Sequence, residues 1–166
     1  PYFKEFTLSW DIGGNARFDH RVDSYSFHCA MAPMLFATLD IRRDNYDFAL
    51  ARKMIAIWRR ASALILYGDY YPHTPFHHNP EQWVARQFDF PEEGRGFIQA
   101  IRLPACPDDT LVVHPKSMQP DSVYVFENPE SGESRKLTGN KVNEDGFTFF
   151  LPKREGAIWF YCILKS

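Results

Sequence analysis

Three aspartates near the start of the chain have the side chain that sugar hydrolysis requires. Asp11 follows the alternating segment FTLSW, and Asp19 and Asp23 follow a loop that contains two glycines. Glycoside hydrolysis typically uses two carboxyl groups roughly 5 to 9 Å apart, one of them protonated by its surroundings. Aspartates are equally suited to loops, where they accept hydrogen bonds from free backbone N–H groups. We interpret the three as loop caps and keep a self-contained hydrolase site as an alternative.

Three histidines, His73, His77 and His78, fall within six residues and could bind a metal ion, because imidazole is the commonest protein ligand. They lie in the proline-rich segment YGDYYPHTPFHHNP, which carries no Cys or carboxylate at a ligand spacing. Adjacent His77 and His78 would point apart in an extended loop. We therefore predict no metal site in this segment.

The sequence contains none of the motifs GxGxxG, GxxxxGK[ST], GxSxG or HExxH. These motifs mark dinucleotide, phosphate, serine-esterase and zinc-protease sites. We therefore expect no cofactor. Aromatic side chains could instead stack on sugar rings, and Trp10 is the best placed of them, because it precedes Asp11 at the end of an expected strand.

The first part of the chain mixes strand and helix patterns. Phe6, Leu8 and Trp10 alternate with polar residues, which predicts a strand that ends at Asp11. Pro33 separates an expected short helix from the segment MLFATLDI, which could be a strand or a helix. Apolar residues at helical spacing then predict a helix over residues 45–66, capped by Asp44 or Asn45 and ended by Gly68. The proline-rich segment after it reads as a semi-rigid connector.

From Gln82 onward the pattern changes to short apolar or alternating segments separated by turns. The six segments are WVARQFDF, GFIQAIRL, TLVVHP, SVYVFENP, GFTFFLP and AIWFYCIL. Closely spaced short strands joined by tight turns predict an antiparallel β-sandwich. We place the domain boundary near residue 80. The expected fold class is α+β and mainly β, with residues 1–80 as a β/α domain and residues 81–166 as the sandwich.

Composition excludes several classes of protein. The chain has 166 residues, too few for a complete (β/α)8 barrel of about 200 or more. Its net charge of −2 gives no reason to expect a nucleic acid or an anionic membrane as partner. No apolar run approaches the roughly 18 residues of a membrane helix, so we expect a soluble protein. The compartment stays open, with the cytoplasm favoured, and the three distant cysteines are expected to be packed thiols.

Several segments together resemble a known enzyme family. They are LYGDYYPHTP, EQWVARQFDFPEEGRGFIQAIRLP, DSVYVFENPESGE and LTGNKVNEDGFTFFLP. In order and spacing they resemble the end of a glycoside hydrolase family 36 enzyme, which is α-galactosidase-like (melibiase), over residues 7–164. One departure is Arg86, where the family pattern has a Trp before QFD. The resemblance implies the last strand and helix of a TIM barrel followed by a C-terminal antiparallel β-sandwich.

The same resemblance implies which part of the full-length parent enzyme carries the catalytic residues and which part contacts the substrate. The family is retaining, and its two catalytic aspartates lie on earlier barrel strands, so no catalytic residue is assigned in this chain. Trp10, Asp11 and Asn15 would lie at the sugar-facing rim and contact the substrate. The expected function is therefore that of a C-terminal fragment of an α-galactosidase-like hydrolase, inactive in isolation.

The partners implied for such a fragment are an α-galactoside substrate and the upstream barrel. Self-association is also expected, because a leftover barrel strand exposes its hydrogen-bonding edge. The alternative is a free-standing carbohydrate-binding or interaction module, supported by the aromatic loop Tyr70 to Phe76.

Overall fold

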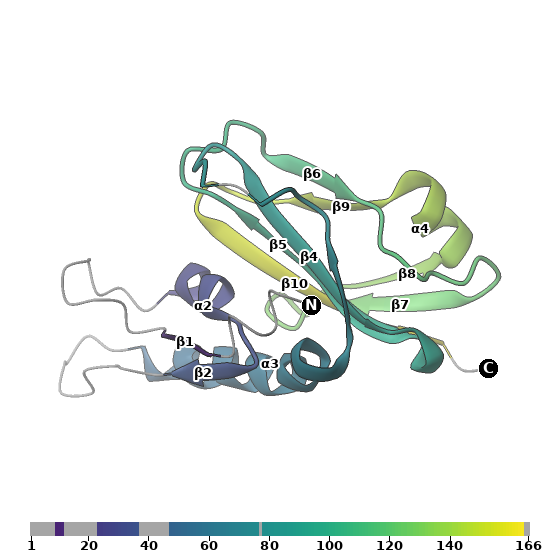
Figure 1. Cartoon of the computed structure of the whole chain (residues 1–166), viewed down its shortest axis with the longest axis horizontal. Helices are drawn as coiled ribbons and strands as arrows, with labels where there is room; N and C mark the ends of the chain where they lie inside the picture. Colours follow the sequence, from purple (N-terminus) through teal and green to yellow (C-terminus); the bar gives the residue numbers. More distant parts are fainter. Residues whose placement is uncertain (1–8, 12–22, 37–46, 77, 165–166) are drawn as a thin grey trace. The chain divides into compact units, whose positions relative to one another are not determined.

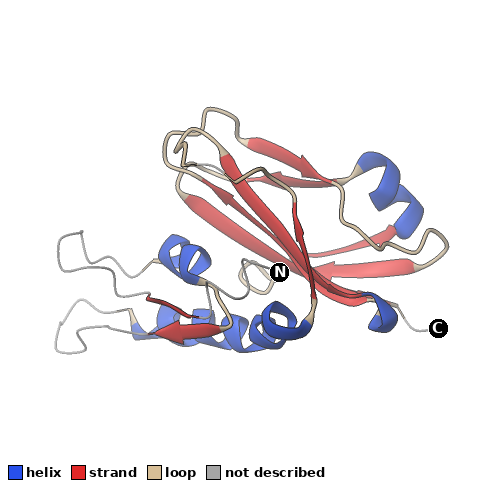
Figure 2. Ribbon diagram, in the orientation of Figure 1, coloured by secondary structure: helices blue, strands red, loops and turns tan. Residues whose placement is uncertain are grey.

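The computed structural model describes residues 9–11, 23–36, 47–76 and 78–164, and the chain forms two compact units (Figures 1 and 2). The first unit comprises Pro1–Tyr67 and the second Gly68–Ser166. The sequence instead placed the change near residue 80. The difference arises because part of the expected connector forms a strand of the second unit.

The first unit has the order strand, helix, strand, helix. Strand β1 (Ser9–Asp11) pairs in parallel with β2 (Met34–Phe36), and helix α2 (Ser24–Ala30) lies between them in the sequence. Helix α3 (Phe48–Tyr67) follows. The structure thus contains the strand ending at Asp11 and the short helix before Pro33, and it shows that MLF after this proline is a strand.

Side-chain caps explain where the two helices of this unit begin. The Asp23 carboxylate accepts a hydrogen bond from the Ser26 backbone N–H at 2.9 Å, at the start of α2. The Asp47 carboxylate accepts from the Leu50 N–H at 2.8 Å, so α3 begins after Asp47 and three residues later than its pattern predicts. The expected caps, Asp44 and Asn45, lie outside the described residues. The Trp58 indole N–H donates to the Ala32 carbonyl at 2.8 Å and ties α3 to the chain before β2.

The second unit is an antiparallel β structure. Its six-stranded sheet has the order β3-β4-β5-β10-β7-β8, and β6 and β9 form a separate two-stranded sheet. The elements are β3 (Asp69–Pro72), β4 (Trp83–Phe90), the 3-10 turn η1 (Pro91–Glu93), β5 (Arg95–Arg102), β6 (Thr110–Val113), β7 (Val123–Glu127), β8 (Ser134–Thr138), α4 (Gly139–Asp145), β9 (Phe147–Phe150) and β10 (Glu155–Ile163).

All six segments predicted as strands are strands of this unit, and two strands and one helix come in addition. The additions are β3, β8 and α4. Strand β3 is the edge strand next to β4, a position that tolerates Pro72 because an edge strand needs no complete ladder. The mainly antiparallel β class expected from the sequence is therefore found.

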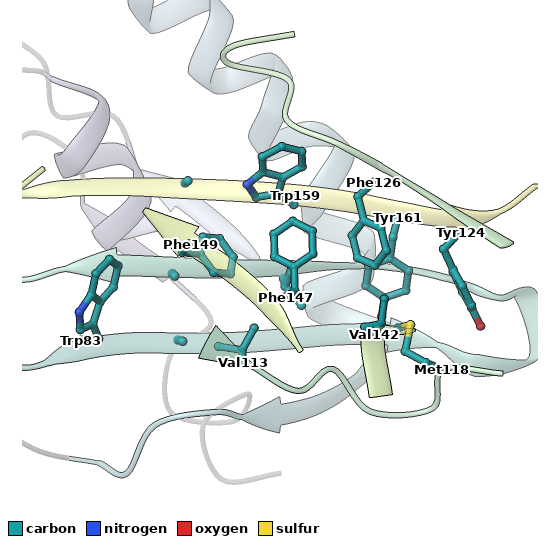
Figure 3. Close-up of a cluster of buried hydrophobic side chains, with 14 of the residues drawn as sticks. Trp83, Val113, Met118, Tyr124, Phe126, Val142, Phe147, Phe149, Trp159 and Tyr161 are labelled. Atoms are coloured by element: carbon teal, nitrogen blue, oxygen red, sulfur yellow. The ribbon is translucent and has the colours of Figure 1, made fainter. Parts of the chain in front are cut away.

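One face of the six-stranded sheet forms the main core of the second unit. Figure 1 shows β6, β9 and α4 on one side of this sheet, and Figure 3 shows the aromatic side chains between them. Phe126, Phe147, Trp159 and Tyr161 are buried there, and the rings of Phe126 and Phe147 lie 4.8 Å apart. The sandwich therefore consists of a large sheet faced by a two-stranded sheet and a short helix.

The other face of the large sheet carries a row of aromatic rings. Tyr70, Phe88, Phe97 and Phe160 are register partners on four neighbouring strands. The centroids of neighbouring rings in this row, taken in that order, are 5.2, 5.2 and 5.6 Å apart. Such cross-strand aromatic contacts stabilise a sheet. Within the described residues, no helix is long and apolar enough to cross a membrane.

Candidate functional site

The expected sugar-contacting residues lie at the end of β1. Trp10 is the register partner of Leu35, and Asp11 is that of Phe36. Because the strands are parallel, both carboxyl ends lie at the same edge, where α/β proteins place ligands. The structure thus adds the end of β2 to this edge, which the sequence did not predict. Asn15 and Asp19 lie outside the described residues.

The third of the early aspartates, Asp23, acts as a helix cap. Its Oδ1 accepts from both the backbone N–H and the hydroxyl of Ser26, at 2.9 and 2.8 Å. The carboxylate is therefore engaged at the start of α2, which agrees with the loop-capping interpretation.

The histidines of the proline-rich segment have separate surroundings. His73 Nε2 lies 3.2 Å from Gln87 Oε1, and the His78 ring lies 4.9 Å from the Phe76 ring, edge to face. His77 is outside the described residues. In the parts of the chain that the structure describes, no three His, Cys, Asp or Glu side chains are grouped so that they could hold a metal ion.

A buried polar cluster, which the sequence did not predict, lies on the core side of the large sheet. It centres on Gln87 and Asp89, two inward-facing residues of β4 that are 0% and 2% exposed. Gln87 Oε1 accepts from the Lys116 backbone N–H at 2.7 Å, and its Nε2 donates to the Lys116 carbonyl at 3.0 Å. The Gln87 amide therefore binds the segment after β6 as another strand would.

The two backbone contacts of Gln87 set the direction of the hydrogen bonds that link His73, Gln87 and Tyr161. Because Oε1 of Gln87 faces an N–H, it is an acceptor, so His73 Nε2 must donate to it. Gln87 Nε2 also donates to the Tyr161 hydroxyl at 2.7 Å, and that hydroxyl donates to Asp89 Oδ1 at 2.8 Å. The chain of hydrogen bonds thus runs from His73 through Gln87 and Tyr161 and ends at the Asp89 carboxyl group.

Gly96 makes this arrangement possible. It lies on β5 between Asp89 on β4 and Tyr161 on β10, as the register partner of both. A Cβ atom at this position would overlap the Tyr161 hydroxyl and the Phe88 carbonyl oxygen. The missing side chain therefore lets the Tyr161 ring cross β5 and reach the carboxyl group two strands away.

Asp89 is the one strongly perturbed acid of the cluster. Burial raises its pKa to about 6, and hydrogen bonds from Tyr161 and Ser117 oppose that rise. The nearby carboxylates of Asp69 and Glu92 raise the pKa further. Oδ2 of Asp89 is buried and has no hydrogen-bond partner among the residues that the structure describes. Burial also raises the pKa of Tyr161 and lowers that of His73, so both stay neutral at neutral pH.

The arrangement can therefore take up or release one proton near neutral pH at Asp89. The sequence carried a partial signal, since Gln87 and Asp89 alternate with Phe88 in WVARQFDF and share a face with buried Trp83. The partners Tyr161 and Gly96 could not be read from the sequence, because they depend on the register of three strands.

Comparison with known proteins identifies a fold. No family model and no curated protein sequence matches the chain. Solved structures do match: the galactosidase domain of the α-galactosidase–sucrose kinase AgaSK superposes with a TM-score of 0.69 and 21% identity, over 93% of this chain and 22% of that one. This chain has the fold of a part of an α-galactosidase.

Two further α-galactosidases give the same result. The GH36 α-galactosidase AgaB from Geobacillus stearothermophilus has a TM-score of 0.64 and 17% identity, over 88% of this chain and 20% of that chain. The α-galactosidase from Lactobacillus brevis has a TM-score of 0.69 and 13% identity, over 94% and 22%. The chain thus spans about a fifth of the length of these α-galactosidases. The family resemblance found in the sequence is confirmed at the level of the fold.

Proposed function

We propose that this chain is the C-terminal part of a retaining α-galactosidase-like glycosidase of glycoside hydrolase family 36. The observation that carries the proposal is the asymmetry of the structural match, which covers 93% of this chain but only 22% of the AgaSK galactosidase domain. The order of the sequence segments that resemble the family supports the same assignment. The parent enzyme would hydrolyse terminal α-galactosides.

In this proposal the first unit is the last β/α portion of a (β/α)8 barrel and the second is the C-terminal β-sandwich. The parallel pairing of β1 with β2 supports it, since barrel strands are parallel and are followed by helices. Trp10 and Asp11 are the last two residues of β1, and Asn15 comes four residues later in the sequence, so all three would reach the substrate from the rim of the barrel. The catalytic aspartates would come from the upstream barrel.

The substrate-contact proposal is tested in the parent enzyme. Trp10→Ala is expected to lower kcat/KM for an aryl α-galactoside about tenfold, because a stacked ring is worth about 1 kcal/mol or more. Asp11→Asn is expected to lower it to a similar extent. Phe150→Ala, which removes an aromatic ring that is 71% exposed on β9 of the second unit, is the matched control. Unchanged kcat/KM in both rim variants would contradict the assignment.

The isolated chain is expected to be inactive. Incubation of the 166-residue polypeptide with p-nitrophenyl α-galactoside should release no nitrophenol above the buffer rate. Steady release that a single Asp→Asn change within the chain abolishes would show a self-contained hydrolase site. That result would replace the fragment proposal with the enzyme alternative.

The isolated chain is also expected to self-associate. Strands β1 and β2 form a sheet of their own, so each has one edge without a partner strand among the described residues. Open edges pair readily with another chain. Light scattering should show dimers or larger species as the concentration rises, and a monomer at high concentration would contradict this expectation.

A free-standing carbohydrate-binding module is the second candidate, favoured by one exposed aromatic residue. Phe76 is 89% exposed, and its ring meets His78 edge to face. Such a ring could stack on a sugar. Calorimetric titration of the isolated chain with galactose and raffinose distinguishes the candidates. Heat of binding that Phe76→Ala abolishes and Phe150→Ala leaves intact would favour the module, and no heat would favour the fragment.

A further inference from the structure

The segment 114–119, between β6 and β7, is fastened to the sheet by side chains instead of a strand ladder. Both backbone groups of Lys116 bind the Gln87 amide, at 2.7 and 3.0 Å. The Gln119 N–H donates to the Tyr124 hydroxyl at 3.0 Å, and the Asn143 side chain of α4 donates to the Met118 carbonyl at 3.1 Å. The attachment therefore depends on three side chains, of which Gln87 belongs to the buried cluster.

The backbone of this segment is also strained. Ser117 has a φ of 63°, in the left-handed region that residues with a Cβ atom seldom adopt. Its hydroxyl lies 3.4 Å from the Tyr71 hydroxyl, and it also hydrogen-bonds to the carboxyl group of Asp89. Strain of this kind persists only while the surrounding contacts hold it. Opening of the segment would release it.

Asp89 lies beneath this segment with half of its carboxyl group unpaired. Oδ1 accepts from Tyr161, whereas the buried Oδ2 has no partner among the described residues. A neutral carboxyl group tolerates such a place at modest cost, but a carboxylate must regain solvation. The register partner of Asp89 on β3 is Asp69, and like charges on opposite residues repel.

We propose that residues 114–119 form a pH-sensitive latch, which is closed on the sheet while Asp89 is neutral and opens when Asp89 ionises. The strands around Asp89 are held by continuous ladders, so the side-chain-fastened segment is the part of the surroundings that can move most cheaply to admit water. Opening would hydrate Oδ2 and relax Ser117.

The groups that face Asp89 come from five parts of the chain, and those that shift its pKa are known. Hydrogen bonds from Tyr161 and Ser117 favour ionisation, whereas the carboxylates of Asp69 and Glu92 oppose it. Tyr124 on β7 stays neutral, since its pKa is raised. Burial outweighs the two favourable hydrogen bonds and raises the pKa of Asp89 to about 6. His73, at the other end of this chain of hydrogen bonds, has a pKa that burial lowers from its ordinary value, and comparison with Asp89→Asn separates its titration from that of Asp89.

The size of the effect follows from linkage. If Asp89 regains an ordinary pKa in the open segment and keeps a pKa of about 6 in the closed one, opening becomes about tenfold more favourable between about pH 5 and pH 7.5. The amides of the segment exchange through this local opening, whereas the ladder amides of β5 and β10 exchange only when the whole unit unfolds.

Amide hydrogen exchange of the full chain tests the latch, after correction for the intrinsic pH dependence of exchange. The reporters are the Lys116 and Gln119 N–H groups. Their protection should fall about tenfold from about pH 5 to pH 7.5 in the native protein and stay constant in Asp89→Asn. Asp121→Asn, which removes an exposed carboxylate close to the same segment, should behave as the native protein.

Three results would overturn the proposal. The first is constant protection of both reporters in the native protein, and the second is an unchanged fall in Asp89→Asn. The third is protection of both reporters as high as that of the ladder amides of β10, which would indicate that they exchange only when the whole unit unfolds. Should Asp89→Asn fail to fold, the carboxyl ¹³C titration of native Asp89 decides, since a midpoint at the ordinary pKa of an aspartate excludes the latch.

Discussion

Arg102 offers the sharpest test of what holds the second unit together. Its side chain is only 6% exposed at the end of β5, and its guanidinium binds three backbone carbonyls. Nε and Nη2 donate to Cys106 O at 3.3 and 3.0 Å, Nη2 also donates to Pro107 O at 3.0 Å, and Nη1 donates to Leu151 O at 2.7 Å. One side chain thus joins the loop after β5 to the segment after β9.

The loss in the free energy of unfolding that an Arg102→Met substitution should cause can be estimated from these four hydrogen bonds. Each hydrogen bond from a charged donor contributes about 1.5 to 3 kcal/mol, so the four would sum to roughly 6 to 12 kcal/mol if they were additive. Removing a buried charge returns several kcal/mol of desolvation energy, and Met refills the volume of the aliphatic stem. We expect a net loss of about 3 kcal/mol. Arg102→Lys should lose about 2 kcal/mol, since one ammonium group cannot reach both segments.

Urea unfolding followed by tryptophan fluorescence measures this loss. The Trp83 indole donates to Asp108 O at 3.1 Å, in the same loop, so its emission reports on the contact. Arg95→Met is the matched control, because Arg95 is 45% exposed in its pairing with Glu93 and should change stability by less than about 0.5 kcal/mol. An Arg102→Met protein that unfolds within about 0.5 kcal/mol of the native one would refute the reasoning.

Three further substitutions have expected outcomes. The pKa of Asp89 is about 6 in the folded protein and higher than in the unfolded chain. The free energy of unfolding should therefore fall as the pH rises from about 4 to above 6, by at most about 3 kcal/mol. Chemical denaturation at several pH values should show this loss in the native protein but not in Asp89→Asn. Gly96→Ala should destabilise the second unit by about 3 kcal/mol and should free the Tyr161 hydroxyl, visible as a changed tyrosine absorbance titration. Asp47→Ala should cost about 1 kcal/mol through the lost cap of α3, and unchanged helix content and melting temperature by circular dichroism would contradict this.

The sequence predicted elements where one local signal was strong. The helix α3 followed from its apolar spacing, and the six strand segments followed from alternation and turn residues. The missed elements lack such signals. Strand β8, SRKLT, is polar and is a strand because it pairs with β7. Strand β3 contains Pro72 and lies in a proline-rich segment, so its sequence predicts a connector. Helix α4 had readable caps in Thr138 and Gly146, but its seven residues are too few for a clear period.

The buried cluster shows a different limit of sequence reasoning. Asp89 and Gln87 are separated from Tyr161 by more than 70 residues, and contact depends on the placement of β10 beside β5. Composition and periodicity contain no information about that placement. The expected sugar-contacting residues, by contrast, came from a strand end and a family resemblance, and their contact with a substrate stays a prediction.

The position of β10 has a consequence for how the second unit forms. This strand follows all the others in the chain order, yet it lies in the middle of the sheet, between β5 and β7. Until it has been synthesised, the nascent chain holds one meander of β3 to β5 and one hairpin of β7 and β8, each with an uncovered inner edge. Cooperative folding of this unit must therefore wait for residues 155–163, and a ribosome that stalls before them leaves a polypeptide prone to aggregation.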